Sequence, residues 1–166
     1  MIRIATTMKL GTVLVAAALL AACSSTKEEA PAPVAQTPTS SIVPGSAEDF
    51  RVNVGDTVFF EVDQHSIRPD AQATLQKQAA WLKQYPQTKL LVEGHCDERG
   101  TREYNLALGD RRAYAVKEFL ISLGVDAARL QTKSYGKERP TCTESDDSCW
   151  QQNRRGYSVL ASGAGS

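Results

Sequence analysis

The chain has 166 residues, and Lys plus Arg balance Asp plus Glu at 19 each, so the formal net charge is zero. Proteins that track nucleic-acid phosphates need a basic excess, so this balance argues against a nucleic-acid partner. Hydrophobic residues make up 42% and charged residues 23%, a composition typical of one globular domain rather than of a disordered or membrane-embedded chain.

The N-terminus resembles an export signal. Arg3 and Lys9 supply positive charge, and the apolar run at 10–22 has the length of a signal-peptide core but is too short to span a bilayer. We therefore predict that residues 1–22 are a signal peptide. Its removal takes away two basic residues and no acid, which changes the net charge from 0 to 0 − 2 = −2.

Cys23 follows Leu-Ala-Ala, and this pattern resembles the bacterial lipobox, in which the cysteine is acylated and becomes the first mature residue. The alternative is a simple secretory signal with an incidental cysteine. Ser24 rather than Asp follows, which resembles the sorting pattern of outer-membrane lipoproteins. We therefore expect a lipid anchor in the outer membrane, with the domain facing the periplasm. Several acyl chains are needed, because one chain binds membranes only marginally.

Beyond Cys23, the chain to residue 50 is rich in Ser, Thr, Ala and Pro and has no apolar periodicity, so residues 23–50 are predicted to be the lipidated cysteine and a disordered linker. Residues 51–161 are predicted to form the domain, and residues 162–166 a flexible tail. The domain is expected to be α/β, an α+β sandwich in βαβαββ order with a mixed four-stranded sheet and parallel pairs joined by crossover helices. The predicted strands are 57–62, 89–96, 130–135 and 154–160, and the predicted helices are 69–85 and 104–123.

One face of the second helix carries a charge among apolar residues. Leu108, Val116 and Leu120 are spaced along a single stripe, and Arg112 lies on the same stripe. A core-facing arginine is costly unless its guanidinium is paired, and its fork suits a carboxylate. Two readings stay open from spacing alone: Arg112 pairs with an internal acid, or it meets a ligand carboxylate.

The strand before this helix is followed by a complementary group. Asp97 comes directly after the strand at 89–96, and the C-terminal ends of strands are where open α/β sheets bind ligands. Its carboxylate can take an ammonium group. Asp97 and Arg112 together would match a zwitterion such as the free amino-acid centre of a peptide.

The stretch LVEGHCDERGTREYNLALGDRRAYAV at 91–116 resembles the signature of the OmpA-like peptidoglycan-binding domain family, most closely its branch of peptidoglycan-associated lipoproteins. The similarity runs from about Val58 to Arg155 and includes YGKERP at 135–140. It implies that Asp97 and Arg112 hold the amino and carboxylate groups of diaminopimelate in the peptidoglycan stem peptide. The resemblance implies supporting roles for Phe60, Thr101, Asn105, Leu108 and Arg155.

The same resemblance implies partners and a role. The expected partners are peptidoglycan, the outer membrane through the lipid anchor, and the Tol proteins, notably the β-propeller TolB, with a part in envelope integrity and constriction during division. The family binds without turnover, so we expect no enzyme activity, no cofactor and no metal ion. A peptidoglycan hydrolase and a purely protein-binding module remain the alternatives.

The sequence departs from the family pattern at several positions. Glu61 stands where Asp is frequent, Ile67 where Leu is frequent, and Cys96 where Ala or Thr is usual. Strand alternation places Cys96 on a buried face. The two added cysteines of the last loop, Cys142 and Cys149, are predicted to form a disulfide, since no C-x-x-C motif or histidine cluster favours a metal.

Metal binding and catalysis fit the spacing of the residues around Asp97 less well. Glu93, His95 and Asp97 resemble a metal-binding trio, but alternate strand residues stand several ångströms apart and do not converge easily. His95 and Cys96 are strand neighbours that point to opposite faces, which disfavours a catalytic dyad. A glycosidase needs a second carboxylate opposed to Asp97, and none is apparent.

Overall fold

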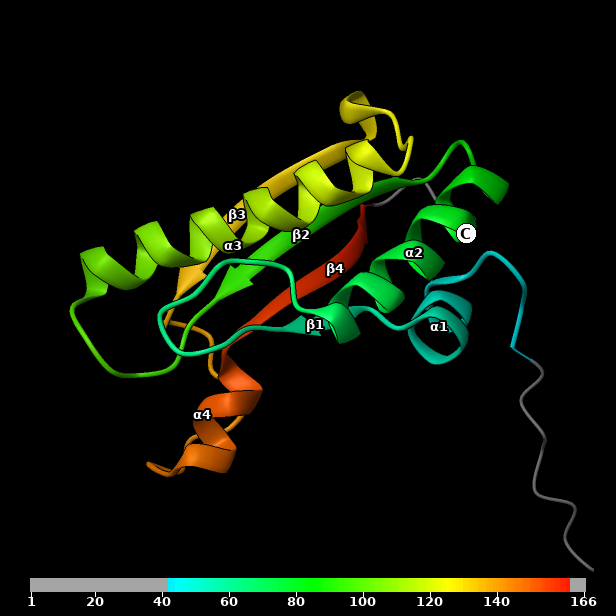
Figure 1. The fold of residues 1–166 in the computed structure, drawn as a ribbon. Helices are drawn as coiled ribbons and strands as arrows, with labels where there is room; N and C mark the ends of the chain where they lie inside the picture. Colours follow the sequence, from blue (N-terminus) through cyan, green and yellow to red (C-terminus); the bar gives the residue numbers. More distant parts are fainter. Residues whose placement is uncertain (1–41, 162–166) are drawn as a thin grey trace, which may run out of the picture. The chain divides into compact units, whose positions relative to one another are not determined.

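Residues 42–161 are described by a computed structural model, in which a four-stranded sheet packs against helices (Figure 1). The predicted mixed four-stranded sheet is confirmed. The strands are β1 (Thr57–Phe59), β2 (Lys89–His95), β3 (Leu130–Gly136) and β4 (Arg155–Ala161). The helical elements are α1 (Ala47–Asp49), the π-helical turn η1 (Phe50–Val54), α2 (Pro69–Gln84), α3 (Arg102–Ser122), the 3-10 turn η2 (Ala127–Arg129) and α4 (Asp147–Asn153).

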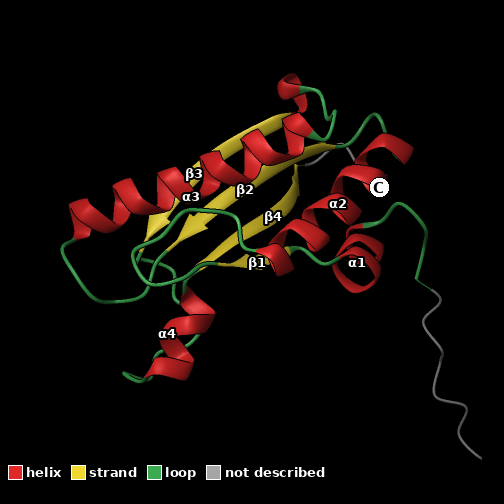
Figure 2. Cartoon of the chain, in the orientation of Figure 1, coloured by secondary structure: helices red, strands yellow, loops and turns green. Residues whose placement is uncertain are grey.

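The strand order is β1-β4-β2-β3, with the last strand of the chain inside the sheet (Figure 2). β2 and β3 are parallel, which confirms the predicted pair around the long helix, since α3 and η2 supply the crossover that a parallel pair needs. β1 and β2 are not neighbours, although the predicted alternation would also pair them. β4 lies between them and is antiparallel to both.

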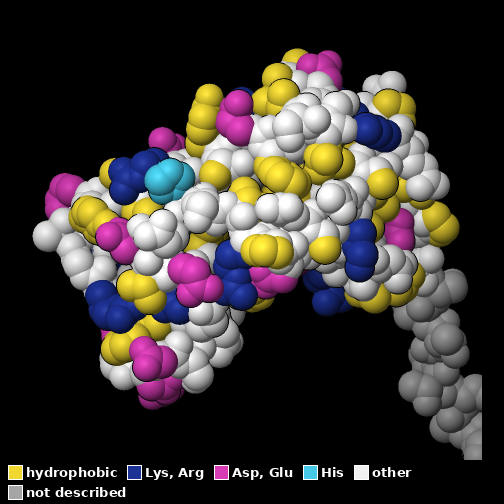
Figure 3. Space-filling model, in the orientation of Figure 1, with side chains coloured by type: hydrophobic (Ala, Val, Ile, Leu, Met, Phe, Trp, Pro, Cys, Tyr) yellow, Lys and Arg dark blue, Asp and Glu magenta, His cyan; other side chains and the backbone are white. Residues whose placement is uncertain are grey.

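The hydrophobic core lies between the sheet and the helices α2 and α3, which cover one of its faces (Figure 2). The predicted stripe of α3 faces this core, with Val116 and Leu120 buried beside Leu82 of α2 and Val92 of β2. Burying each such side chain stabilises the fold by roughly 1.5 to 3 kcal/mol relative to exposure. On the face seen in Figure 3, basic and acidic side chains are interspersed.

Two glycines let α3 approach the sheet closely. A Cβ added at Gly94 in β2 would overlap the backbone carbonyl oxygen of Gly109 in α3, which has no room to move. We therefore expect Gly94→Ala to lower the free energy of unfolding by about 2 to 3 kcal/mol, because helix and strand must separate. Urea unfolding measures the change. Ala107→Ser on the exposed face of α3 is the control, and an equally small effect of both variants would contradict the close packing.

The structure differs from the prediction in one boundary and in one additional helix. The predicted linker ends too late, because α1 begins at Ala47 and Phe50 is only 1% exposed, packed edge-on against Trp81 at a centroid distance of 4.9 Å. One aromatic residue after a Pro-rich stretch shows no periodicity, so the sequence gives no sign of this contact. The loop before β4 also contains a helix, α4, which was not predicted because seven residues are too few to show a helical apolar pattern.

The structure places the three cysteines of the domain as the sequence analysis expected. Cys142 and Cys149 form a disulfide with their Cα atoms 5.2 Å apart, and Cys96 is a free, buried cysteine. No helix within residues 42–161 combines the length and the apolar character needed to cross a membrane. The predicted signal peptide, the lipidation site Cys23, most of the predicted linker and the tail at 162–166 lie outside the described residues.

Candidate functional site

A cleft of about 240 Å³ opens where the loop after β2 meets the first half of α3 and the segment after β1. Both residues that the sequence analysis placed at the centre of the site contribute to its wall. The side chains that line it are Val62, Asp63, Cys96, Asp97, Arg99, Gly100, Tyr104, Asn105, Leu108 and Arg112. The cleft therefore offers an anionic and a cationic group in one concave space.

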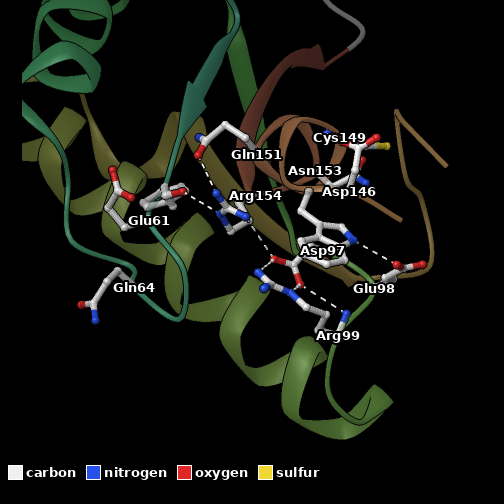
Figure 4. A network of polar contacts seen from close by, with 12 residues as sticks. Glu61, Gln64, Asp97, Glu98, Arg99, Asp146, Cys149, Gln151, Asn153 and Arg154 are labelled. Atoms are coloured by element: carbon white, nitrogen blue, oxygen red, sulfur yellow. Dashed lines mark hydrogen bonds and ion pairs between the residues drawn. The ribbon is translucent and has the colours of Figure 1, made fainter. Parts of the chain in front are cut away.

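Asp97 is held between two arginines (Figure 4). Arg99 donates from Nη2 to Oδ2 at 2.7 Å and from Nε to Oδ1 at 3.1 Å, while Arg154 donates to Oδ2 at 3.3 Å from the buried side. Burial by itself would raise the pKa of Asp97, but the hydrogen bonds from Arg99 and Arg154 outweigh it and lower that pKa. The carboxylate is therefore anionic at neutral pH.

Among the described residues, no carboxylate pairs with Arg112, so the internal ion pair that spacing left open is not formed. Its guanidinium donates to three backbone carbonyls, from Nε to Gln64 at 2.8 Å, from Nη1 to His95 at 2.8 Å and from Nη2 to Glu61 at 3.0 Å. Burial lowers its pKa, and its Cζ lies 5.2 Å from the centroid of the Phe60 ring. A guanidinium has five N–H groups, and these three bonds occupy three of them while the fully buried side chain contributes to the wall of the cleft.

The supporting residues implied by the resemblance fall into different places. Asn105 and Leu108 line the cleft, and the Asn105 amide donates to the carbonyls of Arg99 and Thr101, which shapes the loop. Thr101 is the N-cap of α3 and accepts from the Tyr104 backbone, so it positions the helix. Phe60 is fully buried beneath Arg112 and outside the cleft lining.

Arg155 does not belong to this cleft. It lines a separate cavity of about 290 Å³ with Phe59, Gln152 and others, while its neighbour Arg154 reaches Asp97. Adjacent residues at the start of a strand point to opposite faces, so Arg154 and not Arg155 reaches Asp97 in this structure. Arg154 also donates from Nε to the carbonyl of Phe60 at 3.2 Å, which ties β4 to the segment after β1.

The sequence analysis also missed the rim of the cleft. Asp63 has a positive φ of 58°, rare outside glycine, and its carboxylate accepts from the Tyr104 hydroxyl across the mouth of the cleft. Val62 is 52% exposed beside it. These residues come from an irregular segment whose position the sequence does not specify, and only Asp63, a residue type common in turns, could have drawn attention to it.

Among residues 42–161, no group of three His, Cys, Asp or Glu side chains is arranged to hold a metal ion. His95 is 1% exposed and stacks on Tyr135 at 5.5 Å, and its Nε2 lies 3.5 Å from Glu93. Neither ring nitrogen of His95 has a hydrogen-bond partner among the described residues. Burial, followed by the charges of Arg155 and Arg139, lowers the pKa of His95 from 6.5 to about 4.

This lowered pKa predicts a pH-dependent stability. The unfolded chain takes up the His95 proton near pH 6.5 but the folded chain only near pH 4, so the contribution is complete above 6.5 and declines as the pH falls toward 4. Between pH 7 and pH 5, His95→Phe should lose less unfolding free energy than the wild type, by about 1 kcal/mol after allowance for solvent screening. Urea unfolding at both pH values tests this, and identical pH dependence would refute it.

Comparison with known proteins shows which family the chain belongs to. The model of the OmpA family matches residues 59–154. The peptidoglycan-associated lipoprotein of Mesorhizobium japonicum is 56% identical over 154 residues, which cover 92% of this chain and 91% of that protein. The peptidoglycan-associated lipoprotein of Agrobacterium fabrum is 62% identical over 125 residues, covering 75% of this chain and 70% of that protein.

Solved structures agree with these sequence matches. The crystal structure of the peptidoglycan-associated lipoprotein from Burkholderia pseudomallei has a TM-score of 0.63 and 45% identity, covering 64% of this chain and 90% of that one. The C-terminal domain of Helicobacter pylori MotB has a TM-score of 0.60 at 24% identity, covering 64% of this chain and 84% of that one, and this likeness concerns the fold alone. The chain therefore belongs to the OmpA family and, within it, to the peptidoglycan-associated lipoproteins.

Proposed function

We propose that the protein binds peptidoglycan non-covalently by clasping the diaminopimelate of the stem peptide in the Asp97 cleft. The observation that carries this proposal is the presence of Asp97 and Arg112 in the wall of one open cleft. The names of the relatives point to the same polymer. At about 240 Å³ the cleft is smaller than most small-molecule pockets, so it suits an amino-acid side chain better than a disaccharide.

Binding exchanges one cation on Asp97 for another. Arg154 holds the carboxylate from the buried side, whereas the Arg99 side chain is 40% exposed and can move aside for a ligand ammonium. The ligand carboxylate then lies against Arg112, whose buried guanidinium supplies positive charge at the wall of the cleft. Both ends of the zwitterion are paired and no covalent bond changes, so the complex forms and dissociates without turnover.

In this proposal the lipid at Cys23 holds the outer membrane while the domain holds the cell wall. The similarity to the Mesorhizobium japonicum lipoprotein extends over 92% of the chain, which supports a lipid-anchored protein of the envelope. A linker from residue 24 to Ser46, the N-cap of α1, has some 23 residues and could reach roughly 75 Å when fully stretched, and about 26 Å on average as a flexible coil. Such a reach separates the cleft from the anchoring membrane.

The partnership with Tol proteins, notably TolB, and the role in envelope integrity and cell division rest on the family resemblance. TolB binding to the purified domain tests the partnership directly. A protein-binding module without a wall ligand would bind TolB, but it would stay in the supernatant when sacculi are sedimented. The proposal expects the domain to sediment with sacculi.

Cosedimentation with purified sacculi tests the wall ligand. Free diaminopimelate at millimolar concentration should release the bound protein, whereas lysine, which lacks the second amino-acid centre, should release less. Release of soluble muropeptides from the sacculi would instead reveal a hydrolase. Sedimentation that diaminopimelate leaves unchanged would exclude the cleft as the site of binding.

A further inference from the structure

The short helix α4 contacts the loop that carries Asp97. The Trp150 ring packs against the Arg99 guanidinium, whose Cζ lies 4.2 Å from the ring centroid, and the indole N–H donates to Glu98 Oε1 at 2.9 Å. Arg154, the C-cap residue of α4, donates to Asp97. Figure 4 shows Asp97, Glu98 and Arg99 facing this helix. Side chains of α4 and of its C-cap residue therefore contact three consecutive residues of the loop.

α4 is in turn held by cross-links at the preceding loop. The disulfide joins Cys142 in that loop to Cys149 inside the helix. The Asn153 side chain accepts from the backbone N–H groups of Thr141 and Cys142 and donates to the Cys142 carbonyl at 2.7 Å. A helix of seven residues is not stable alone in water, so its position depends on these connections.

We infer that the Cys142–Cys149 disulfide is a positioning element of the cleft, and that its reduction weakens ligand binding at Asp97. The inference rests on the proposed function. A dithiol reductant breaks the sulfur–sulfur bond, each cysteine gains one electron and one proton, and the two reductant sulfurs become joined instead. Cys142 is partly exposed, which gives the reductant a path to the bond.

The remaining cysteine does not take part in this exchange. Cys96 is 3% exposed, and its thiol donates to the carbonyl of Asn105. Burial raises the pKa of Cys96 to about 11, so the thiol stays protonated, and only a thiolate attacks a disulfide. The redox response is therefore confined to the pair that holds α4.

The direction of the expected change in affinity follows from how well the loop is ordered before the ligand binds. With the disulfide intact, Trp150 holds Glu98 and Arg154 holds Asp97, so α4 keeps these side chains and the loop in place before any ligand arrives, while the exposed Arg99 side chain can still move aside. After reduction, these side chains and the loop gain freedom that binding must remove again. The free-energy cost of immobilising two large side chains and part of a loop on binding corresponds to a loss of affinity of about tenfold.

Calorimetric titration of the mature protein with a soluble diaminopimelate-containing tripeptide tests the inference. Reduction with dithiothreitol should weaken binding about tenfold. The double variant Cys142→Ser, Cys149→Ser should bind weakly with or without reductant, and Trp150→Ala should bind weakly although its disulfide is intact. Glu144→Ala, an exposed change between the two cysteines, should behave like the wild type. Equal affinities of the oxidised and reduced wild type would overturn the inference.

A measurement without ligand separates this inference from the proposed function. Amide hydrogen exchange at residues 97–101 should accelerate on reduction, while exchange in β2 and the core of α3 stays slow. If this acceleration is seen but the oxidised protein does not bind the tripeptide, the proposed function fails and the coupling stands. If the oxidised protein binds and exchange at 97–101 ignores reduction, the coupling fails alone. Retained slow exchange in β2 also shows that the variants fold.

Discussion

Asp97→Asn is expected to reduce binding to sacculi about 100-fold, because the amide keeps the size of the carboxylate but cannot pair with a ligand ammonium. Removing one member of a buried charge pair costs roughly 2 to 5 kcal/mol in binding, and the lower part of that range, about 2.7 kcal/mol, corresponds to this factor. The affinity is measured by cosedimentation over a series of sacculus concentrations. Asp110→Asn is the matched control, since Asp110 is an exposed residue of α3 outside the cleft lining.

The substitution also leaves Arg154 partly uncompensated, since its side chain is 7% exposed and Asp97 is its ionic partner. Arg154 keeps its bonds to Phe60 and Gln151, so we expect the protein to stay folded. Circular dichroism of Asp97→Asn verifies the fold before binding is measured. Full binding by a folded Asp97→Asn protein would remove the basis of the proposed site.

Arg112→Ala is expected to lower the free energy of unfolding by about 3 to 5 kcal/mol, because three backbone carbonyls lose their donor and a cavity replaces a fully buried side chain. This expectation corrects the simpler idea that Arg112 is only a ligand contact. Urea unfolding measures the loss. Arg111→Ala removes the exposed neighbouring arginine of the same helix, and it should change stability by less than about 0.5 kcal/mol.

The structural role of Arg112 changes how its binding role must be tested. A variant that unfolds cannot report on a ligand contact, so loss of binding by Arg112→Ala is not informative by itself. Arg112→Lys keeps the charge but lacks the planar fork, so it can satisfy fewer of the carbonyls of Glu61, Gln64 and His95. We expect it to be folded at low temperature, less stable than the wild type, and weaker in binding. If Arg112→Ala were as stable as the wild type and Arg111→Ala, the bonds from Arg112 to the three carbonyls would not stabilise the fold as we expect.

Arg112 and Asp97 therefore have different roles in the structure. Arg112 joins the segment after β1, the end of β2 and the middle of α3, and it is part of the core as much as of the cleft. Asp97 lies in a loop with cations on either side, one buried and one exposed. The exposed Arg99 neutralises the carboxylate in the structure. In the proposed function a ligand ammonium has to displace this internal counter-ion, so we expect it to limit the affinity and to favour release.

The sequence alone identified the features that depend on local patterns. Alternation in β2 placed Cys96 on a buried face, apolar spacing identified the buried stripe of α3, and Pro69 marked the start of α2. The motif around Asp97 and Arg112 pointed to two residues that share one cleft, and the pair Cys142 and Cys149 was found from cysteine arithmetic. In each case the signal lies in neighbouring letters of the chain.

Only the tertiary structure decided what those residues touch. The carbonyls that hold Arg112 lie up to 51 residues away, and every residue has a carbonyl, so no letter of the sequence marks them. The choice of Arg154 rather than Arg155 depends on which face each side chain takes as α4 passes into β4. The place of β4 between β1 and β2 decides that geometry, and it follows from packing of the whole sheet rather than from any local pattern.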